Sequence, residues 1–368
     1  MRQLIPTAAL ALLLFSGRAL ADEVFVRTAS GAELKQTGTI SQDDSEGLAL
    51  RIAGGQGEQV FRPHEVIRAK VKYECLQRHY ETGRGYENAK EYDLAIGKYE
   101  DAVKDAAVPK FARQYAWLRM AKCYEKLNEM EKAAGSYKKL VEEMPKTAFL
   151  RDVAEGQFNC YVRLNKWDEA SKSLAILRAQ GEDGAFLASV FDAELLERKA
   201  ERKEGEYSKA AEAYRAVAKK QPAPEVLCKA HAGTARCMLL DGQAAEAAEF
   251  AKKALAVKGC TSTAAADAHQ VIGESLLAGL PEKAADLAQE KNRERALDAI
   301  EEMMRPVLQY RGSPWAEERA YYFVGLWAGR LGGAAVGPEW AGREAWAFKE
   351  LRAKFPNGAM VKQLKDAK

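Results

Sequence analysis

A small residue recurs along this chain at a nearly constant interval of 37 to 40 residues. It is alanine each time, at Ala95, Ala133, Ala170, Ala210 and Ala247. Three of these alanines are followed four residues later by a tyrosine, at Tyr99, Tyr137 and Tyr214. Positions four apart lie on one face of an α-helix, so a small and a large side chain adjoin there. Repetition at this period predicts stacked helical units that bury their apolar faces against one another.

The clearest unit begins at Gln114 and extends to Pro145. Its apolar residues form two helical stripes separated by a polar turn. The stripes contain Trp117, Met120, Ala121 and Tyr124, then Ala133, Tyr137 and Leu140. Pro145 ends the second stripe because proline lacks an N–H group and clashes with the preceding helical turn. The unit is therefore predicted to be a helical hairpin, with Tyr124 in its core.

This order of small, aromatic and proline positions resembles the tetratricopeptide repeat. Further units begin at Leu76, Arg151, Phe191 and Cys228, and two later units centre on Gly273 and Gly325. The interval is slightly longer than the family's period of about 34 residues. The resemblance implies a mainly α fold: a right-handed α-solenoid of about seven hairpins over residues 73–360, followed by a tail at 361–368.

Residues 22–72 have a different pattern. Short runs of alternating apolar and polar residues are separated by turns at 30–31, 43–47 and 54–57. About five such runs predict a small antiparallel β-module, similar in shape to an SH3-like or Sm-like barrel. The module either caps the first helix of the repeats or has a function of its own.

Residues 1–21 predict a secretory signal peptide. Arg2 precedes an apolar run from Leu4 to Phe15, and Ala19-Leu20-Ala21 provides a cleavage site after Ala21. The run is too short to span a membrane. Its removal lowers the formal charge from +3 towards zero, which excludes a general attraction to nucleic acid or anionic lipid. We therefore expect an exported bacterial protein, periplasmic or secreted, without a transmembrane segment.

Export makes the cysteines informative. The sequence has six of them: Cys75, Cys123, Cys160, Cys228, Cys237 and Cys260. Under the repeat resemblance, Cys123, Cys160 and Cys237 share position 10, which packs against the neighbouring unit, so they are predicted to be buried apolar side chains. Cys228 and Cys260 lie at the two ends of one hairpin that the antiparallel arrangement brings together. That placement allows either a disulfide or two free thiols.

The sequence has no recognisable catalytic, cofactor-binding or metal-binding motif. His79, His231 and His269 fall at one repeat position where the family prefers an aromatic residue. They are a repeat or more apart, so we predict that they pack in the core rather than share a metal. We therefore expect no enzyme activity, no cofactor and no metal site.

The resemblance also implies a binding groove. In the family, positions such as 9 and 13 of each first helix line this groove. Basic residues occupy several of these positions: Arg84, Lys122, Lys126, Arg163, Lys199, Lys203 and Arg236. They favour an acidic or carboxylate-terminated peptide as partner, through charge-assisted hydrogen bonds. Acids such as Glu87 and Asp152 occur nearby, so an ordinary solvated face is the alternative.

The leading prediction is an exported scaffold that binds another protein or peptide in a cell-envelope assembly. A second hypothesis is attachment to cell wall or carbohydrate through the β-module, whose only aromatic residues are Phe25 and Phe61. A third is an unrecognised envelope enzyme in that module, whose only histidine is His64. The sequence leaves the oligomeric state open.

Overall fold

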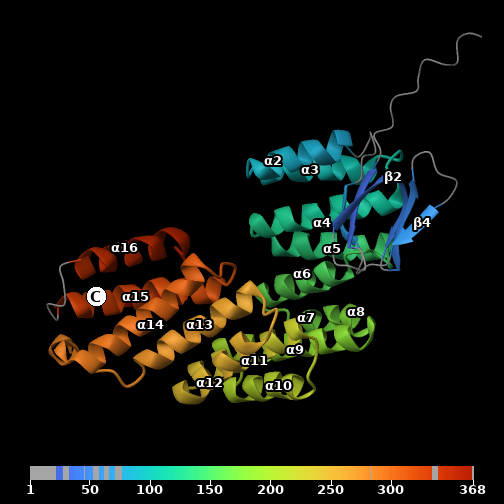
Figure 1. Ribbon diagram of the computed structural model, residues 1–368. Helices are drawn as coiled ribbons and strands as arrows, with labels where there is room; N and C mark the ends of the chain where they lie inside the picture. Colours follow the sequence, from blue (N-terminus) through green and yellow to red (C-terminus); the bar gives the residue numbers. More distant parts are fainter. Residues whose placement is uncertain are drawn as a thin grey trace, which may run out of the picture. The chain divides into compact units, whose positions relative to one another are not determined.

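The computed structural model describes residues 22–27, 33–44, 46–52, 58–61, 66–70, 77–281, 283–333 and 339–366 (Figure 1). The chain forms two compact units, with the boundary between Ile176 and Leu177. The expected signal peptide and Cys75 lie outside the described residues. Within the described ranges, no helix is both long enough and apolar enough to cross a lipid bilayer.

The N-terminal module is an antiparallel sheet. Its strands are β1 (Asp22–Arg27), β2 (Glu33–Asp44), β3 (Gly47–Ile52), β4 (Glu58–Phe61) and β5 (Val66–Lys70). Their order is β4-β3-β2-β1-β5, and Val24, Ile40 and Leu50 contribute to the buried core of the sheet. The predicted closed barrel is wrong, because closure requires β4 to pair with β5 and these are the two outer strands of the described sheet.

The rest of the first unit consists of helical hairpins. Its helices are η1 (Gln77–Glu81), α2 (Thr82–Asn88), α3 (Tyr92–Lys104), α4 (Lys110–Lys126), α5 (Met130–Glu143), α6 (Leu150–Arg163) and α7 (Trp167–Ser173), and α8 (Ala175–Arg178) crosses the boundary. From η1 to α7 each helix packs on the next in the chain, because a single amphipathic helix cannot cover its own apolar stripe.

The second unit continues the same pattern. Its helices are α9 (Gly181–Glu201), α10 (Tyr207–Lys219), α11 (Pro224–Leu240), α12 (Ala244–Ala256), α13 (Ser262–Leu277), η2 (Ala284–Ala288), α14 (Glu290–Leu308), α15 (Pro314–Gly333), α16 (Glu339–Lys354) and α17 (Ala359–Asp366). The mainly α fold of paired, tetratricopeptide-like helices is therefore confirmed, while the right-handed solenoid stays a prediction. The expected tail from residue 361 is instead helical up to Asp366, with Val361 and Leu364 buried in the core.

The recurrent alanines lie where the helices meet. All five are fully buried: Ala95, Ala133, Ala170, Ala210 and Ala247. The tyrosines beside them are buried as well, and their rings lie against glycines of the first helices: Tyr99 on Gly83, Tyr137 on Gly156 and Tyr214 on Gly233. Tyr124, which we expected in the core, is only half-buried at its edge.

Five of the described hairpins share one kind of turn. A residue with positive φ follows the first helix, at Lys90, Asn128, Asn165, Lys203 and Gly242. The next N–H group donates back to the helix end, as from Glu129 to the carbonyl oxygen of Tyr124 at 2.9 Å. This turn satisfies carbonyl groups that a helix end leaves open. It also provides a common register for comparing the hairpins.

That register corrects the fourth hairpin. Residues 202–206 separate α9 from α10, whereas the shorter segment 127–129 separates α4 from α5. The turn residue Lys203 precedes Ala210 by seven residues, whereas in the other four hairpins this separation is five. The positions of α9 are therefore shifted by two residues towards the N-terminus, although Ala210 keeps its expected place. Lys203 is therefore the turn residue itself, and Glu197 rather than Lys199 occupies position 9 of this hairpin.

Candidate partner-binding face

The first helices of the first unit expose a row of basic side chains, which we call the first-unit face. It consists of Arg84 on α2, Lys122 and Lys126 on α4, and Arg163 on α6, all at least partly exposed. Lys126 and Arg163 occupy the last turns of their helices, where a positive charge is favoured by the helix dipole.

These basic groups are only weakly held by their own chain. Lys122 pairs with Asp152 across α4 and α6 at 3.0 Å, and the Lys122 side chain is 38% exposed. Arg163 donates to the neutral side-chain oxygen of Asn128 at 2.6 Å. Exposed pairs of this kind contribute about 0 to 1 kcal/mol, so a partner's carboxylate can replace the present acceptors at little cost.

Two acidic residues of the first unit form hydrogen bonds with side chains between the helices. Glu87 accepts hydrogen bonds from Tyr99 at 2.8 Å and from Arg119 at 2.9 Å. Glu125 accepts one from Tyr137 at 2.7 Å. Burial, together with these carboxylates, raises the pKa of both tyrosines well above the ordinary value. Glu87 and Glu125 therefore support the packing of the hairpins.

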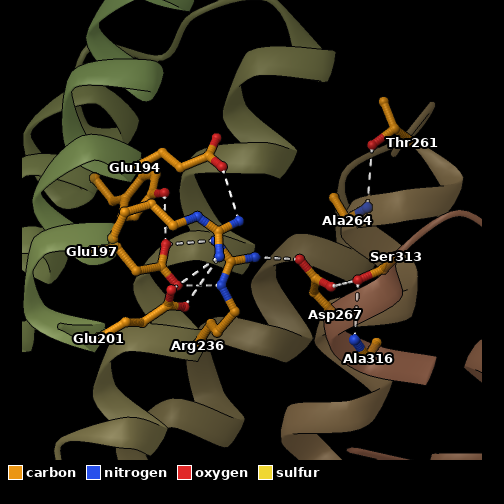
Figure 2. A network of polar contacts seen from close by, with 11 residues as sticks. Glu194, Glu197, Glu201, Arg236, Thr261, Ala264, Asp267, Ser313 and Ala316 are labelled. Carbon is orange, nitrogen blue, oxygen red and sulfur yellow. Dashed lines mark hydrogen bonds and ion pairs between the residues drawn. The ribbon is translucent and has the colours of Figure 1, made fainter. Parts of the chain in front are cut away.

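The corresponding side of the second unit carries a buried ion-pair network around Arg236 (Figure 2). Arg236 on α11 contacts Glu197 on α9 and Asp267 on α13, and its side chain is 13% exposed. Ser313, at the start of α15, donates to Asp267. Arg236 thus joins α9, α11 and α13 directly, and Ser313, which precedes α15, is linked to them through Asp267.

Burial and charge compete in this network. Burial acts to raise the pKa of Glu197, but the charge and hydrogen bonds of Arg236 outweigh it, so the pKa is lowered. For Asp267 burial prevails, and its pKa is raised despite Arg236 and Ser313. The Tyr214 hydroxyl also donates to Glu197 at 3.0 Å, which links the network to the helical interface below it.

A second buried pair lies further along the same side. Arg319 on α15 donates to Glu274 on α13, with Nε 2.6 Å from Oε1. The ring of Trp315 lies beside both guanidinium groups, 5.6 Å from Arg236 and 5.3 Å from Arg319. The first helices of this unit pack directly on one another, α11 on α13 and α13 on α15. In the first unit each first helix packs chiefly on second helices.

The structure therefore separates the seven predicted groove residues. It brings Arg84, Lys122, Lys126 and Arg163 onto the first unit. The expectation for Arg236 is corrected, because its charge is already neutralised in the interior by two acids. Lys199 and Lys203 do not occupy positions 9 and 13, because the fourth hairpin is shifted by two residues. The repeat pattern alone did not indicate Glu197, Asp267, Glu274 and Arg319, although opposite charges on successive first helices were a usable signal.

Cys228 and Cys260 form a disulfide in the structure, with a Cα–Cα distance of 5.4 Å. It joins the start of α11 to the segment after α12. Cys123, Cys160 and Cys237 are buried thiols, as predicted from their shared repeat position. Burial raises the pKa of Cys123 and of Cys160 to about 12, so these thiols stay protonated and unreactive near neutral pH.

The histidines do not converge. His269 on α13 is buried, and its Nδ1 lies 2.6 Å from a carboxylate oxygen of Glu302 on α14. His79 and His231 are half-buried in other hairpins. Among the residues described, no group of three or more histidine, cysteine or acidic side chains has the arrangement of a metal site.

Comparisons with known proteins match one segment of the chain to a repeat family. Residues 115–147 match the tetratricopeptide repeat family. The crystal structure of a MamA protein is 20% identical, with a TM-score of 0.36, and the match covers 50% of this chain and 91% of that one. A STAND protein with a tetratricopeptide repeat sensor, from Pyrococcus horikoshii, is 16% identical, with a TM-score of 0.46 and coverages of 78% and 43%.

A tetratricopeptide repeat protein from Parabacteroides merdae is 12% identical, with a TM-score of 0.34, and the match covers 67% of this chain and 98% of that one. A comparison with curated proteins gave no match. The family match thus covers one hairpin, α4 and α5, and the other helices of the described chain are paired in the same way.

Proposed function

We propose that this chain is an exported scaffold whose first-unit face binds an acidic segment of another protein, within a cell-envelope assembly. Tetratricopeptide repeats generally bind proteins or peptides and are typically not catalytic. The observation that carries the proposal is the contrast between the two units. The basic groups of the first unit are exposed and weakly paired, whereas the corresponding groups of the second unit are buried in ion pairs.

Export rests on the signal-like sequence of residues 1–21, with cleavage after Ala21. The Cys228–Cys260 disulfide supports it, because structural disulfides persist mainly in oxidising compartments such as the periplasm or the exterior of the cell.

The test is a binding measurement with defined probes. Ten-residue peptides rich in glutamate and aspartate are immobilised beside the same peptides with glutamine and asparagine in place of the acids. The wild-type chain is expected to bind the acidic set selectively. Replacement of Lys122, Lys126 and Arg163 by glutamate should weaken binding by more than about 100-fold, because each lost charged hydrogen bond contributes about 1.5 to 3 kcal/mol.

The matched control reverses three exposed lysines of the second unit: Lys209, Lys219 and Lys252. Both variants change the net charge equally, so a general electrostatic effect would weaken both to the same extent. The proposal is contradicted if the two variants lose binding equally. It is also contradicted if the acidic peptides and their glutamine and asparagine versions bind equally.

A further inference from the structure

The turn between β2 and β3 is held on the first unit by its own acidic residues. The carbonyl oxygen of Asp43 accepts a hydrogen bond from the Gln114 side chain at 2.8 Å. The carboxylate of Asp43 accepts another from the Tyr115 hydroxyl. Lys146, in the loop between α5 and α6, forms an ion pair with Glu46. We call Gln114, Tyr115, Lys146 and Thr147 the turn seat.

The seat itself is a connected structure. Gln114 is fully buried, and its side-chain oxygen accepts hydrogen bonds from the Thr147 hydroxyl at 2.6 Å and from the Ala148 N–H at 3.2 Å. Thr147 also forms an isolated antiparallel bridge with Asp44. The seat therefore recognises the turn through its backbone as well as through its carboxylates.

The seat adjoins the first-unit face. Tyr115 and Lys122 are seven residues apart on α4, so they lie on the same side of this helix. The Tyr115 ring packs edge-on against Phe149, with 5.1 Å between centroids, and lies 6.4 Å from the ring of Tyr80. The seat and the first-unit face therefore share one side of α4.

Within the described part of the chain, the carboxylate charge of Asp43 has no opposite charge to balance it in this position. It is 6% exposed, and no lysine or arginine among the described residues pairs with it. Asp44 and Glu46 add negative charge in the same turn, and Lys146 is engaged with Glu46. The pKa of Asp43 is raised to about 6, because burial and the charge of Asp44, which raise it, outweigh the hydrogen bond from Tyr115, which lowers it.

We propose that the β2–β3 turn is a removable occupant of the turn seat, which it leaves when Asp43 ionises. This release does not depend on the function proposed above.

The sign of the pH effect follows from the two states of the turn. The ordinary pKa of an aspartate is 3.8, and that of docked Asp43 is about 6. Docking is therefore strongest below pH 3.8 and weakens as the pH rises through 6. The difference between the two pKa values corresponds to docking that is about 100-fold weaker above pH 7.

Hydrogen exchange of the full chain at pH 5 and pH 8, normalised for intrinsic rates, tests release by ionisation. Residues 42–50 and 144–150 are expected to be less protected at pH 8. Asp43→Asn, which keeps an acceptor for Tyr115 but cannot ionise, should abolish the difference. Glu46→Gln removes an exposed charge of the same turn and should preserve it. Equal protection of the wild type at both pH values, or an undiminished difference in Asp43→Asn, overturns the proposal.

Should Asp43→Asn not fold, Tyr115→Phe decides the question. This variant loses the hydrogen bond that lowers the pKa of Asp43, so the midpoint of release should move to higher pH. An unchanged or lowered midpoint overturns release by ionisation.

Discussion

The ring of Tyr137 fills the space that a side chain on Gly156 would occupy. A Cβ atom on Gly156 would lie 2.3 Å from Cζ of Tyr137. Gly156→Ala is therefore expected to lower the free energy of unfolding by about 1 to 3 kcal/mol, because the buried tyrosine must move. Gly135→Ala, where a Cβ meets nothing within 4 Å, is the control and should stabilise the helix by up to about 1 kcal/mol. Denaturant unfolding measures both, and similar effects would exclude the tight contact.

Arg236 is expected to contribute to stability rather than to partner binding. Arg236→Met leaves Glu197 as a buried charge without its main partner, which should cost about 3 to 5 kcal/mol. The matched change at an exposed arginine, Arg84→Met, should cost less than about 1 kcal/mol. Addition of Glu197→Gln to Arg236→Met should restore part of the loss. If this double variant were no more stable than Arg236→Met, the uncompensated charge would not be the cause.

The second unit should lose stability in acid through Glu302. The hydrogen bond from His269 lowers the pKa of Glu302 below its ordinary value of 4.5. The resulting stabilisation is present above pH 4.5 and is lost as the pH falls through the lowered value. Glu302→Gln should therefore flatten the acid limb of the stability curve measured by urea unfolding from pH 3 to pH 6. The exposed neighbour Glu301 provides the control, and an equal flattening by Glu301→Gln would contradict this assignment.

The disulfide should stabilise the second unit by restricting the unfolded chain. Cys228 and Cys260 are 32 residues apart, and a loop of this size corresponds to about 3 to 4 kcal/mol. Reduction of the wild type should therefore lower its melting temperature. The double variant Cys228→Ser with Cys260→Ser should melt at that lower temperature and should not respond to reductant. Mass spectrometry of the unreduced exported protein checks the bond, and two free thiols would contradict it.

Much of the fold could be predicted from local spacing. The buried alanines and the tyrosines Tyr99, Tyr137 and Tyr214 fall where the 37- to 40-residue interval put them, because helix packing depends on side-chain size at fixed positions. The shared repeat position of Cys123, Cys160 and Cys237 likewise predicted buried thiols. The open sheet could not be predicted, since alternation marks strands without specifying which outer strands pair.

The candidate site was less predictable because it depends on partners far apart in the chain. Position 9 holds Lys122 in one hairpin and Arg236 in another, yet only the second meets acids from two neighbouring helices. Lys199 and Lys203 were assigned to the wrong repeat positions because the loop of the fourth hairpin has two additional residues. These residues leave Ala210 at its expected place, so the spacing of the alanines gives no sign of them. The contact of Tyr115 with Asp43 joins residues 72 positions apart and has no counterpart in the repeat pattern.

The ion-pair network of the second unit has a consequence for how this protein changes over generations. A substitution at Lys122 or Arg163 alters a solvated surface and leaves folding nearly untouched, so such positions are free to drift towards new ligands. A substitution at Glu197, Arg236 or Asp267 unbalances three charges at once and survives only with a compensating change. Among homologues, Lys122 and Arg163 should therefore vary more than Glu197, Arg236 and Asp267.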